Sequence, residues 1–142
     1  MSECIFCKII SGTIPSVKIY EDDLVLAFLD ISPINFGHTL VIPKEHHSSA
    51  ATIPEPTAGR MFHIGARIGV ALKRRLDYDA FNLHLADGSA AGQVVMHAHL
   101  HVVPRGVSDG FHWNWRQLSY PEGKMNEIAA EVSARLAADL AE

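Results

Sequence analysis

Cysteine, positive charge and long apolar runs are all scarce in this sequence of 142 residues. The only two cysteines are Cys4 and Cys7, and a structural disulfide between them is not expected in a reducing compartment. Twelve Lys and Arg residues face sixteen Asp and Glu residues, so the basic excess of a general nucleic-acid-binding protein is absent and no nucleic-acid partner is expected. No apolar run approaches the roughly 18 residues that cross a membrane, and no secretory signal is visible. We therefore expect a cytoplasmic protein that does not associate with membranes.

What remains describes one globular domain over residues 1–142, with 48% hydrophobic and 20% charged residues. Short segments rich in β-branched and aromatic residues predict strands at 17–20, 24–31, 38–42, 79–86 and about 94–103. Helical spacing of apolar residues predicts one long helix within 52–77 and a closing amphipathic helix over 124–141. The first three strands read as an antiparallel meander. This order predicts an α+β fold with an antiparallel sheet rather than βαβ repeats.

The segment QVVMHAHLHVVPR, residues 93–105, places three histidines at strict alternation. On a strand, His97, His99 and His101 share one face, with Ala98 and Leu100 on the other. A buried imidazole needs partners for two ring nitrogens, so three in register favour a function over simple packing. Imidazole serves as a nucleophile, as a general base or as a zinc ligand. No HExxH or HxHxDH pattern is present, and the triplet alone leaves these alternatives open.

Two neighbouring motifs carry further chemistry. The loop from Asp87 to Gln93 is rich in glycine and alanine, so its backbone N–H groups could approach a phosphate closely. Joined directly to the three histidines, this loop predicts a phosphate-handling site. Cys4-x-x-Cys7 could be a redox pair, two buried small residues or half of a zinc site; no thioredoxin-like context supports the redox interpretation.

The ordered motifs IFCKIISGTIPSVKIYEDD, FLDISP, GHTLVIPKEH and DGSAAGQVVMHAHLHVVPR resemble those of the histidine triad (HIT) family of nucleotide hydrolases and transferases. The form AGQxVxHxHxHxxPR is most similar to prokaryotic members and to the dinucleoside-polyphosphate hydrolase branch, whereas the Hint branch usually lacks the proline-arginine pair. The resemblance implies a five-stranded antiparallel sheet with one long central helix and a C-terminal helix. It also implies a homodimer in which two sheets join edge to edge.

The resemblance also implies a reaction centre. His99 matches the nucleophile that attacks the α-phosphorus, forms a covalent nucleotidyl-histidine and releases a nucleoside monophosphate after hydrolysis. His101 matches a residue that hydrogen-bonds the phosphate, His38 one that lines the site from a neighbouring strand, and Gln93 one near the phosphates. The implied substrate is a purine nucleotide in which the α-phosphate forms a phosphoanhydride or a phosphoramidate.

Substrate-binding residues follow from the same resemblance. Asp30 matches the residue that binds the ribose hydroxyls, and Gly92 with its neighbouring amides would meet developing negative charge. The implied base slot consists of Ile5, Phe6, Ile9, Phe28, Leu29 and Ile31. Two positions depart from the pattern: Ala86 stands where related enzymes often have Asn or Gln, and Val94 where a Ser or Thr hydroxyl often meets the phosphate.

The resemblance implies a structural zinc ion held by Cys4, Cys7, His46 and His97, remote from the phosphate, and no organic cofactor. His47, the neighbour of His46, is not part of this set. Two rival functions stay open at this stage. One is a zinc-dependent hydrolase in which the histidines hold a catalytic metal, and the other is a nucleotide-binding module with little catalysis, which Ala86 and Val94 favour.

Overall fold

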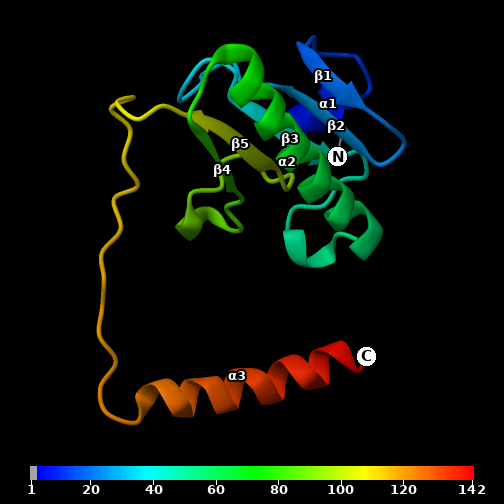
Figure 1. Cartoon of the computed structure of the whole chain (residues 1–142). Coiled ribbons are helices and arrows are strands. Elements are labelled where there is room, and N and C mark those ends of the chain that lie inside the picture. The colour runs from blue at the N-terminus through cyan, green and yellow to red at the C-terminus, as the bar shows by residue number, and fades with distance from the viewer. Residues whose placement is uncertain (1–2) are drawn as a thin grey trace. The chain divides into compact units, whose positions relative to one another are not determined.

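The computed structural model describes residues 3–142 and divides the chain into two compact units, Met1–Phe111 and His112–Glu142. The first unit holds all five strands and two of the α-helices (Figure 1). In chain order its elements are α1 (Ile5–Ile10), β1 (Lys18–Glu21), β2 (Val25–Leu29), β3 (Thr39–Pro43), a 3₁₀ turn (Ala50–Thr52), α2 (Glu55–Leu76), β4 (Ala80–His84), a 3₁₀ turn (Ser89–Ala91) and β5 (Leu100–Arg105). The second unit holds α3 (Lys124–Leu140), which matches the helix predicted over 124–141.

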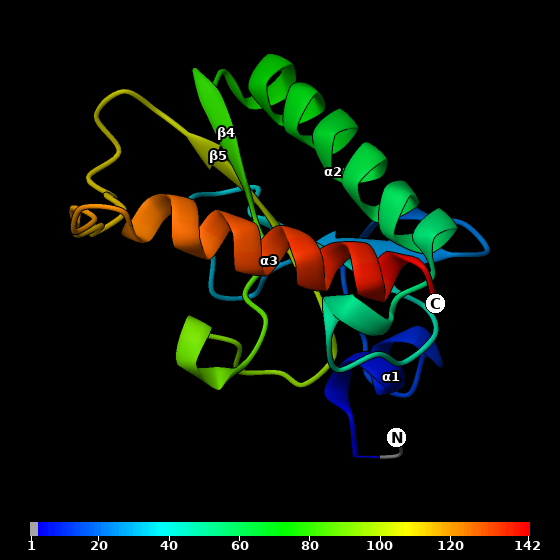
Figure 2. The same cartoon turned by 90° about the horizontal axis from the view of Figure 1, so that it is seen from below.

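The five strands form one antiparallel sheet in the order β1-β2-β3-β5-β4. The first three strands form the predicted meander, and α2 then carries the chain across the sheet to its far edge. There β4 pairs only with β5, which lies beside it in Figure 2. The predicted α+β class with a five-stranded antiparallel sheet is confirmed.

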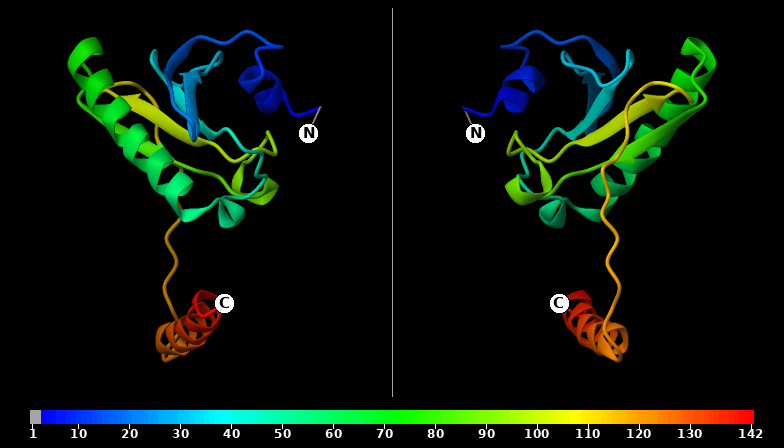
Figure 3. Two further views of the ribbon diagram at one scale, coloured as in Figure 1. Left: turned by 90° about the vertical axis from the view of Figure 1, so that its right-hand side faces the viewer. Right: turned by 90° about the vertical axis from the view of Figure 1, so that its left-hand side faces the viewer.

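Helices α1 and α2 cover opposite faces of this sheet, as the left-hand view of Figure 3 shows. On one face, α2 residues such as Ile64 and Ile68 pack against Val25, Val41 and Val102. On the other face, α1 packs against the alternate residues of the same strands. That second cluster contains Phe6, Ile9, Leu26, Phe28, Leu40 and Ile42. Because β2 and β3 are buried on both faces, their sequences are continuous apolar runs rather than alternating ones.

The strand predicted at about 94–103 begins only at Leu100, which corrects the prediction for its first half. Only His101 lies in β5, whereas His97 and His99 precede it. The ladder pairs Val41 with Leu100 and stops there, because Pro43 at the end of β3 has no N–H to continue it. The Ala98 amide instead donates to the carbonyl of His47, at 2.7 Å.

The predicted division of side chains between two faces nevertheless holds. Ala98, Leu100 and Val102 lie in the core beneath α2, whereas the rings of His97 and His99 contact Phe6 of α1, with centroids 5.8 and 5.2 Å apart. The six-residue helix α1 has no counterpart among the predicted elements. None of the helices among residues 3–142 is long and apolar enough to cross a membrane.

Helix α2 approaches the sheet so closely at Gly65 and Gly69 that these two residues must stay small, and Gly69 is the tighter of the two. A Cβ at Gly69 would lie 2.5 Å from the Phe81 ring, whereas a Cβ at Gly59 of the same helix would meet nothing within 4 Å. Gly69→Ala should therefore lower the free energy of unfolding by about 1–3 kcal/mol. The matched variant Gly59→Ala should raise it by roughly 0.5–1 kcal/mol through helix propensity alone. Urea denaturation measures both, and equal effects of the two changes would contradict the packing described.

Candidate functional site

A cavity of about 630 Å³ opens between α1, the edge of the sheet and the histidine segment. Its wall contains His99 and His101, together with Asp30 and Gly92. All nine residues assigned to substrate binding line it, namely Asp30, Ile5, Phe6, Ile9, Phe28, Leu29, Ile31, Gly92 and Val94. The structure therefore brings together, in one cavity, side chains that are spread over most of the first unit.

The apolar part of the cavity combines aliphatic side chains with two phenylalanine rings. Phe6 meets Phe28 edge-on, with ring centroids 5.5 Å apart, and meets the His99 ring at 5.2 Å and nearly perpendicular. Among the large hydrophobic residues that line the cavity, Ile31 and Val94 are the most exposed, at 98% and 87%. The slot is therefore walled by a fixed aromatic edge and has apolar side chains open to solvent at its rim.

One hydrogen bond fixes the tautomer of His99. Its Nδ1 lies 2.8 Å from the carbonyl oxygen of His97. A carbonyl oxygen can only accept, so Nδ1 carries the proton and Nε2 keeps a lone pair. His99 is buried and lines the cavity, and Nε2 is its ring nitrogen with a free lone pair.

A second set of bonds fixes His38 and His101. The Ile34 amide donates to Nδ1 of His38 at 3.0 Å, so the proton of His38 lies on Nε2. That Nε2–H lies 2.9 Å from Nδ1 of His101 and donates to it. His101 then carries its own proton on Nε2, which makes this atom a hydrogen-bond donor.

Burial keeps these two rings neutral. It lowers the pKa of His101 to about 4, an effect reinforced by the neighbouring His99, His38 and His84. Burial also lowers the pKa of His38, although the nearby Asp30 carboxylate acts in the opposite direction. Both imidazoles are therefore uncharged at neutral pH, which the hydrogen-bond chain requires.

Asp30 stands at the end of β2 with one oxygen engaged and one available. Its Oδ1 accepts from the Ser32 amide at 2.8 Å, and its Oδ2 lies 3.7 Å from Nε2 of His38. The side chain is 20% exposed. The carboxylate is thus oriented by its own turn and can still accept hydroxyl donors from the cavity.

Gln93 lies in the loop before the histidines but is not among the residues that line the cavity. Its Oε1 accepts from the Gly88 amide at 2.7 Å, and its Nε2 donates to the carbonyls of Ser48 and Val95 at 2.8 and 3.1 Å. The amides of Ala91, Gly92 and Gln93 likewise donate to carbonyls of Gly88 and Ser89. Gln93 therefore closes this loop internally, and its assignment to the phosphates stays a prediction.

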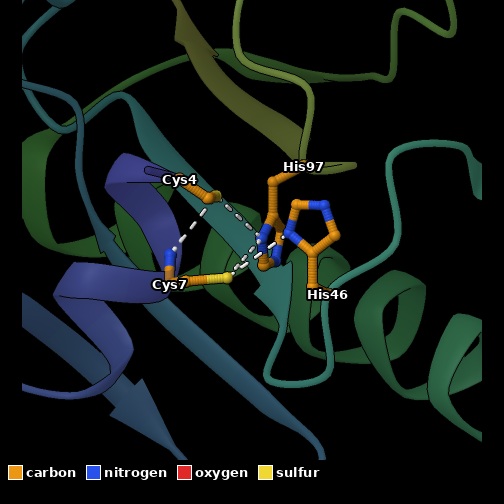
Figure 4. Close-up of side chains that lie close together, drawn as sticks. All are labelled: Cys4, Cys7, His46 and His97. Carbon is orange, nitrogen blue, oxygen red and sulfur yellow. Dashed lines mark hydrogen bonds between the residues drawn. The ribbon is translucent and has the colours of Figure 1, made fainter. Parts of the chain in front are cut away.

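Four predicted metal ligands converge behind the histidine segment. Figure 4 shows Cys4 and Cys7 at the start of α1 facing His46, from the loop after β3, and His97. Cys4 Sγ lies 3.4 Å from Nδ1 of His97, and Cys7 Sγ lies 3.3 Å from Nδ1 of His46 and 3.7 Å from Nδ1 of His97. All four ligand atoms lie within 4.8 Å of one another.

This donor set fits a tetrahedral zinc ion. Bond lengths of about 2.3 Å to sulfur and 2.0 Å to nitrogen separate adjacent ligands by roughly 3.5 Å. His97 donates from Nε2 to the Pro43 carbonyl at 2.8 Å, which leaves Nδ1 unprotonated toward the thiols. Burial raises the pKa of the Cys7 thiol and lowers that of the His97 ring. A bound cation would lower the pKa of the thiol again, and it requires the unprotonated ring that burial favours at His97. His47 lies outside the cluster and pairs with Thr52 at 3.0 Å.

Asp30, His38 and His101 form a second group whose ligand atoms lie close enough for a metal. The hydrogen bonds argue against that use, because the Ile34 amide occupies Nδ1 of His38 and leaves its Nε2 protonated. This group is therefore a hydrogen-bonded network that fixes which ring nitrogen of each histidine carries the proton. The His97 end of the segment thus belongs to the group of metal-ligand candidates, whereas His99 and His101 belong to the cavity wall.

Sequence reasoning missed part of the cavity wall. Ile14, Pro15, Ser16, Ser32, Leu40 and Val95 also line it. Pro15 and Ser16 follow α1, a helix that the sequence did not predict, and Ser32 follows Asp30 within FLDISP. Proximity to Asp30 was the one available signal, and it could have identified Ser32.

The low pKa of His101 makes stability depend on pH in a defined window. An unfolded histidine takes up its proton near pH 6.5, whereas folded His101 takes it up near 4. Between these values the unfolded chain binds more protons, so lowering the pH from 7 to 5 should cost about 2 kcal/mol through this residue. Denaturation of the wild type and of His101→Gln at both pH values measures the difference. An identical pH dependence of the two proteins would contradict the assignment.

Comparison with known proteins gives a consistent result. The HIT domain family matches residues 11–107. An uncharacterized HIT-like protein of Borreliella burgdorferi is 45% identical over 139 residues, which covers 96% of this chain and 100% of that one. Adenylylsulfatase HINT3 of Arabidopsis thaliana is 41% identical over 131 residues, covering 92% of this chain and 66% of that one.

Solved structures agree in fold. A HIT family protein of Bacillus subtilis superposes with a TM-score of 0.87 at 40% identity, covering 94% of this chain and 96% of that one. A zinc-bound histidine triad family protein of Mycobacterium smegmatis superposes with a TM-score of 0.75 at 39% identity, covering 99% of both chains. The chain therefore belongs to the HIT domain family, the family of nucleotide hydrolases and transferases.

Proposed function

We propose that the protein is a hydrolase or nucleotidyltransferase that cleaves at the α-phosphate of a purine nucleotide through His99. The observation that carries the proposal is the lone pair on Nε2 of His99, fixed by the bond from Nδ1 to the His97 carbonyl, at the wall of the cavity. The bond that is cleaved is a phosphoanhydride or a phosphoramidate.

The reaction proceeds in two displacements. Nε2 of His99 forms a bond to the α-phosphorus, and the bond to the leaving group breaks, with the leaving group taking the electron pair and a proton from solvent. The ring becomes cationic, and its Nδ1–H remains bonded to the His97 carbonyl, whose partial negative charge stabilises that cation. Water then forms the new P–O bond and releases a proton to solvent, the N–P bond breaks with its electron pair returning to Nε2, and a nucleoside monophosphate leaves.

The remaining contacts hold the substrate for this attack. His101 donates from Nε2 to a phosphate oxygen, and the hydrogen bond that its Nδ1 accepts from His38 keeps the proton of His101 on Nε2. Asp30 accepts the ribose hydroxyls with its Oδ2. The base lies in the slot beside Phe6, whose edge also supports the His99 ring.

The leaving-group side carries fewer polar groups. Ala86 is buried, and Val94 exposes an apolar side chain to the cavity where a hydroxyl was expected from the resemblance. The histidines are then the main donors to the phosphate, because the amides of Ala91, Gly92 and Gln93 already donate to carbonyls of their own loop. This feature keeps a nucleotide-binding module with little catalysis as the second candidate.

Cys4, Cys7, His46 and His97 would hold a structural zinc ion, supported by the convergence of their ligand atoms. When bound, the ion would cross-link α1, the loop after β3 and the histidine segment, with no open position for water. The rival in which zinc is catalytic has less support, because neither His99 nor His101 offers a nitrogen to this cluster.

A homodimer and a cytoplasmic location stay predictions. Within residues 3–142, β4 ends the strand order beside β5, and an edge position of this kind is where a second copy could extend the sheet.

Replacing the nucleophile tests the proposal. After brief incubation with an adenosine phosphoramidate or a diadenosine polyphosphate, the intact mass of the wild type should rise by one nucleotidyl group. His99→Ala should show no adduct and lose turnover by at least about 1,000-fold, because the covalent route is gone. The control is His63→Gln, an exposed histidine on α2. An adduct on His99→Ala would refute the assignment, and binding without an adduct in the wild type would favour the binding module.

Metal analysis separates the two roles of zinc. Cys7→Ala should lose the bound ion and about 3 kcal/mol or more of unfolding free energy. His47→Gln, beside the cluster but outside it, should keep the ion. Turnover should survive chelation under conditions in which the protein remains folded. A folded, metal-free protein without activity would instead support the zinc-dependent hydrolase.

A further inference from the structure

We infer that Asn35 is a positioning residue for the reaction: it holds the loop whose backbone fixes the ring tautomers of His38 and His101. The inference rests on the proposed function, because it is there that the Nε2–H of His101 meets a phosphate. Asn35 lies between β2 and β3 and is not among the residues that line the cavity.

The Asn35 side chain ties its loop to the far end of β5. Its Nδ2 donates to the Pro104 carbonyl at 2.8 Å and to Oδ2 of Asp109 at 2.9 Å. These two bonds use both amide hydrogens and join segments about 70 residues apart in the sequence. The loop is therefore anchored by one side chain with a single orientation.

The acceptor of this anchor is itself held rigidly. The carboxylate of Asp109 accepts hydrogen bonds from Nε of Arg105 at 2.7 Å and from the amides of Gly106 and Phe111 at 3.2 and 3.0 Å. The Arg105 guanidinium holds the pKa of Asp109 well below its usual range, so this group stays a carboxylate at neutral pH. Its side chain is only 10% exposed.

Asn35 stands between the two contacts that orient His38. Its own carbonyl accepts the His38 amide at 3.0 Å, and the preceding residue, Ile34, donates its amide to Nδ1 of His38 at 3.0 Å. His38 then donates from Nε2 to Nδ1 of His101 at 2.9 Å. A continuous path of hydrogen bonds and one short stretch of backbone thus connects Asn35 to the donor on His101.

Loss of the anchor has a defined chemical consequence. If the Ile34 amide moves away, His38 can carry its proton on Nδ1 and present a lone pair at Nε2. His101 must then protonate Nδ1 to keep the bond, and its Nε2 presents a lone pair to the phosphate oxygen, which repels it. Asp30, 3.7 Å from Nε2 of His38, opposes this change by favouring a proton there, so the shift should be partial.

The chain offers a matched control on the same loop. Tyr78 donates its hydroxyl to the carbonyl of Phe36 at 2.7 Å, so Tyr78→Phe removes a tether next to Asn35 without altering the anchor. Asn35→Ala removes the anchor, and Asn35→Leu removes it while keeping the side-chain volume. The leucine variant carries the test if the alanine variant does not fold.

The experiment combines ring ¹⁵N NMR of the histidines with steady-state kinetics on an adenosine phosphoramidate. The wild type and Tyr78→Phe should show the Nε2–H tautomer at His38 and His101. The Asn35 variants should show a mixture, with kcat lower by roughly tenfold, the loss typical when a partner that orients a histidine is removed. KM should change much less, because the base slot and Asp30 are untouched.

Wild-type tautomers and kcat in folded Asn35 variants would overturn the inference. Equal effects of Tyr78→Phe and the Asn35 variants would overturn it as well, because general loop rigidity would then be the cause. If the wild type itself shows no turnover, the proposed function fails, and the ring spectra alone decide the inference: unchanged tautomers reject it and shifted ones support it.

Discussion

The hydrogen bond from the His99 ring to the His97 carbonyl is the contact on which the site depends. It leaves Nε2 as the ring nitrogen of His99 with a free lone pair, and in the proposed reaction it would stay in place to stabilise the charge that the attack creates. The carbonyl is held because the His97 side chain is itself fixed, by Pro43 on one ring nitrogen and by the two thiols on the other. The proposed zinc site and the proposed reaction centre are therefore coupled through the backbone carbonyl of His97.

Backbone groups, rather than charges, set the chemistry of the other histidines too. The Ile34 amide determines the tautomer of His38, and His38 determines that of His101. Burial keeps the pKa of both rings low, so they work as neutral, directional donors. A site of this kind needs its loops held to within a few tenths of an ångström, which explains why bonds at Asn35 and Gln93 lie just outside the cavity.

Much of this could be predicted from the sequence because it lies in local patterns. The alternation of histidines with Ala98 and Leu100 correctly divided the two faces, and the spacing in α2 correctly located the long helix. The motif resemblance grouped residues that the cavity unites. Two predictions failed for different reasons. The start of β5 depends on a non-local contact, because Pro43 ends the β3–β5 ladder before His99, whereas α1 is too short to show a helical period. The bonds of Asn35 and Gln93 depend on partners far along the chain or on loop closure, which no local pattern reports.

The account is tested most directly by asking which ring nitrogen carries phosphorus in the trapped nucleotidyl-enzyme. With ¹⁵N-labelled histidine, the one-bond ³¹P–¹⁵N coupling of the denatured adduct identifies the linked atom. The hydrogen bond between Nδ1 of His99 and the His97 carbonyl predicts phosphorus on Nε2 of His99. Phosphorus on Nδ1, or on His101, would contradict the account.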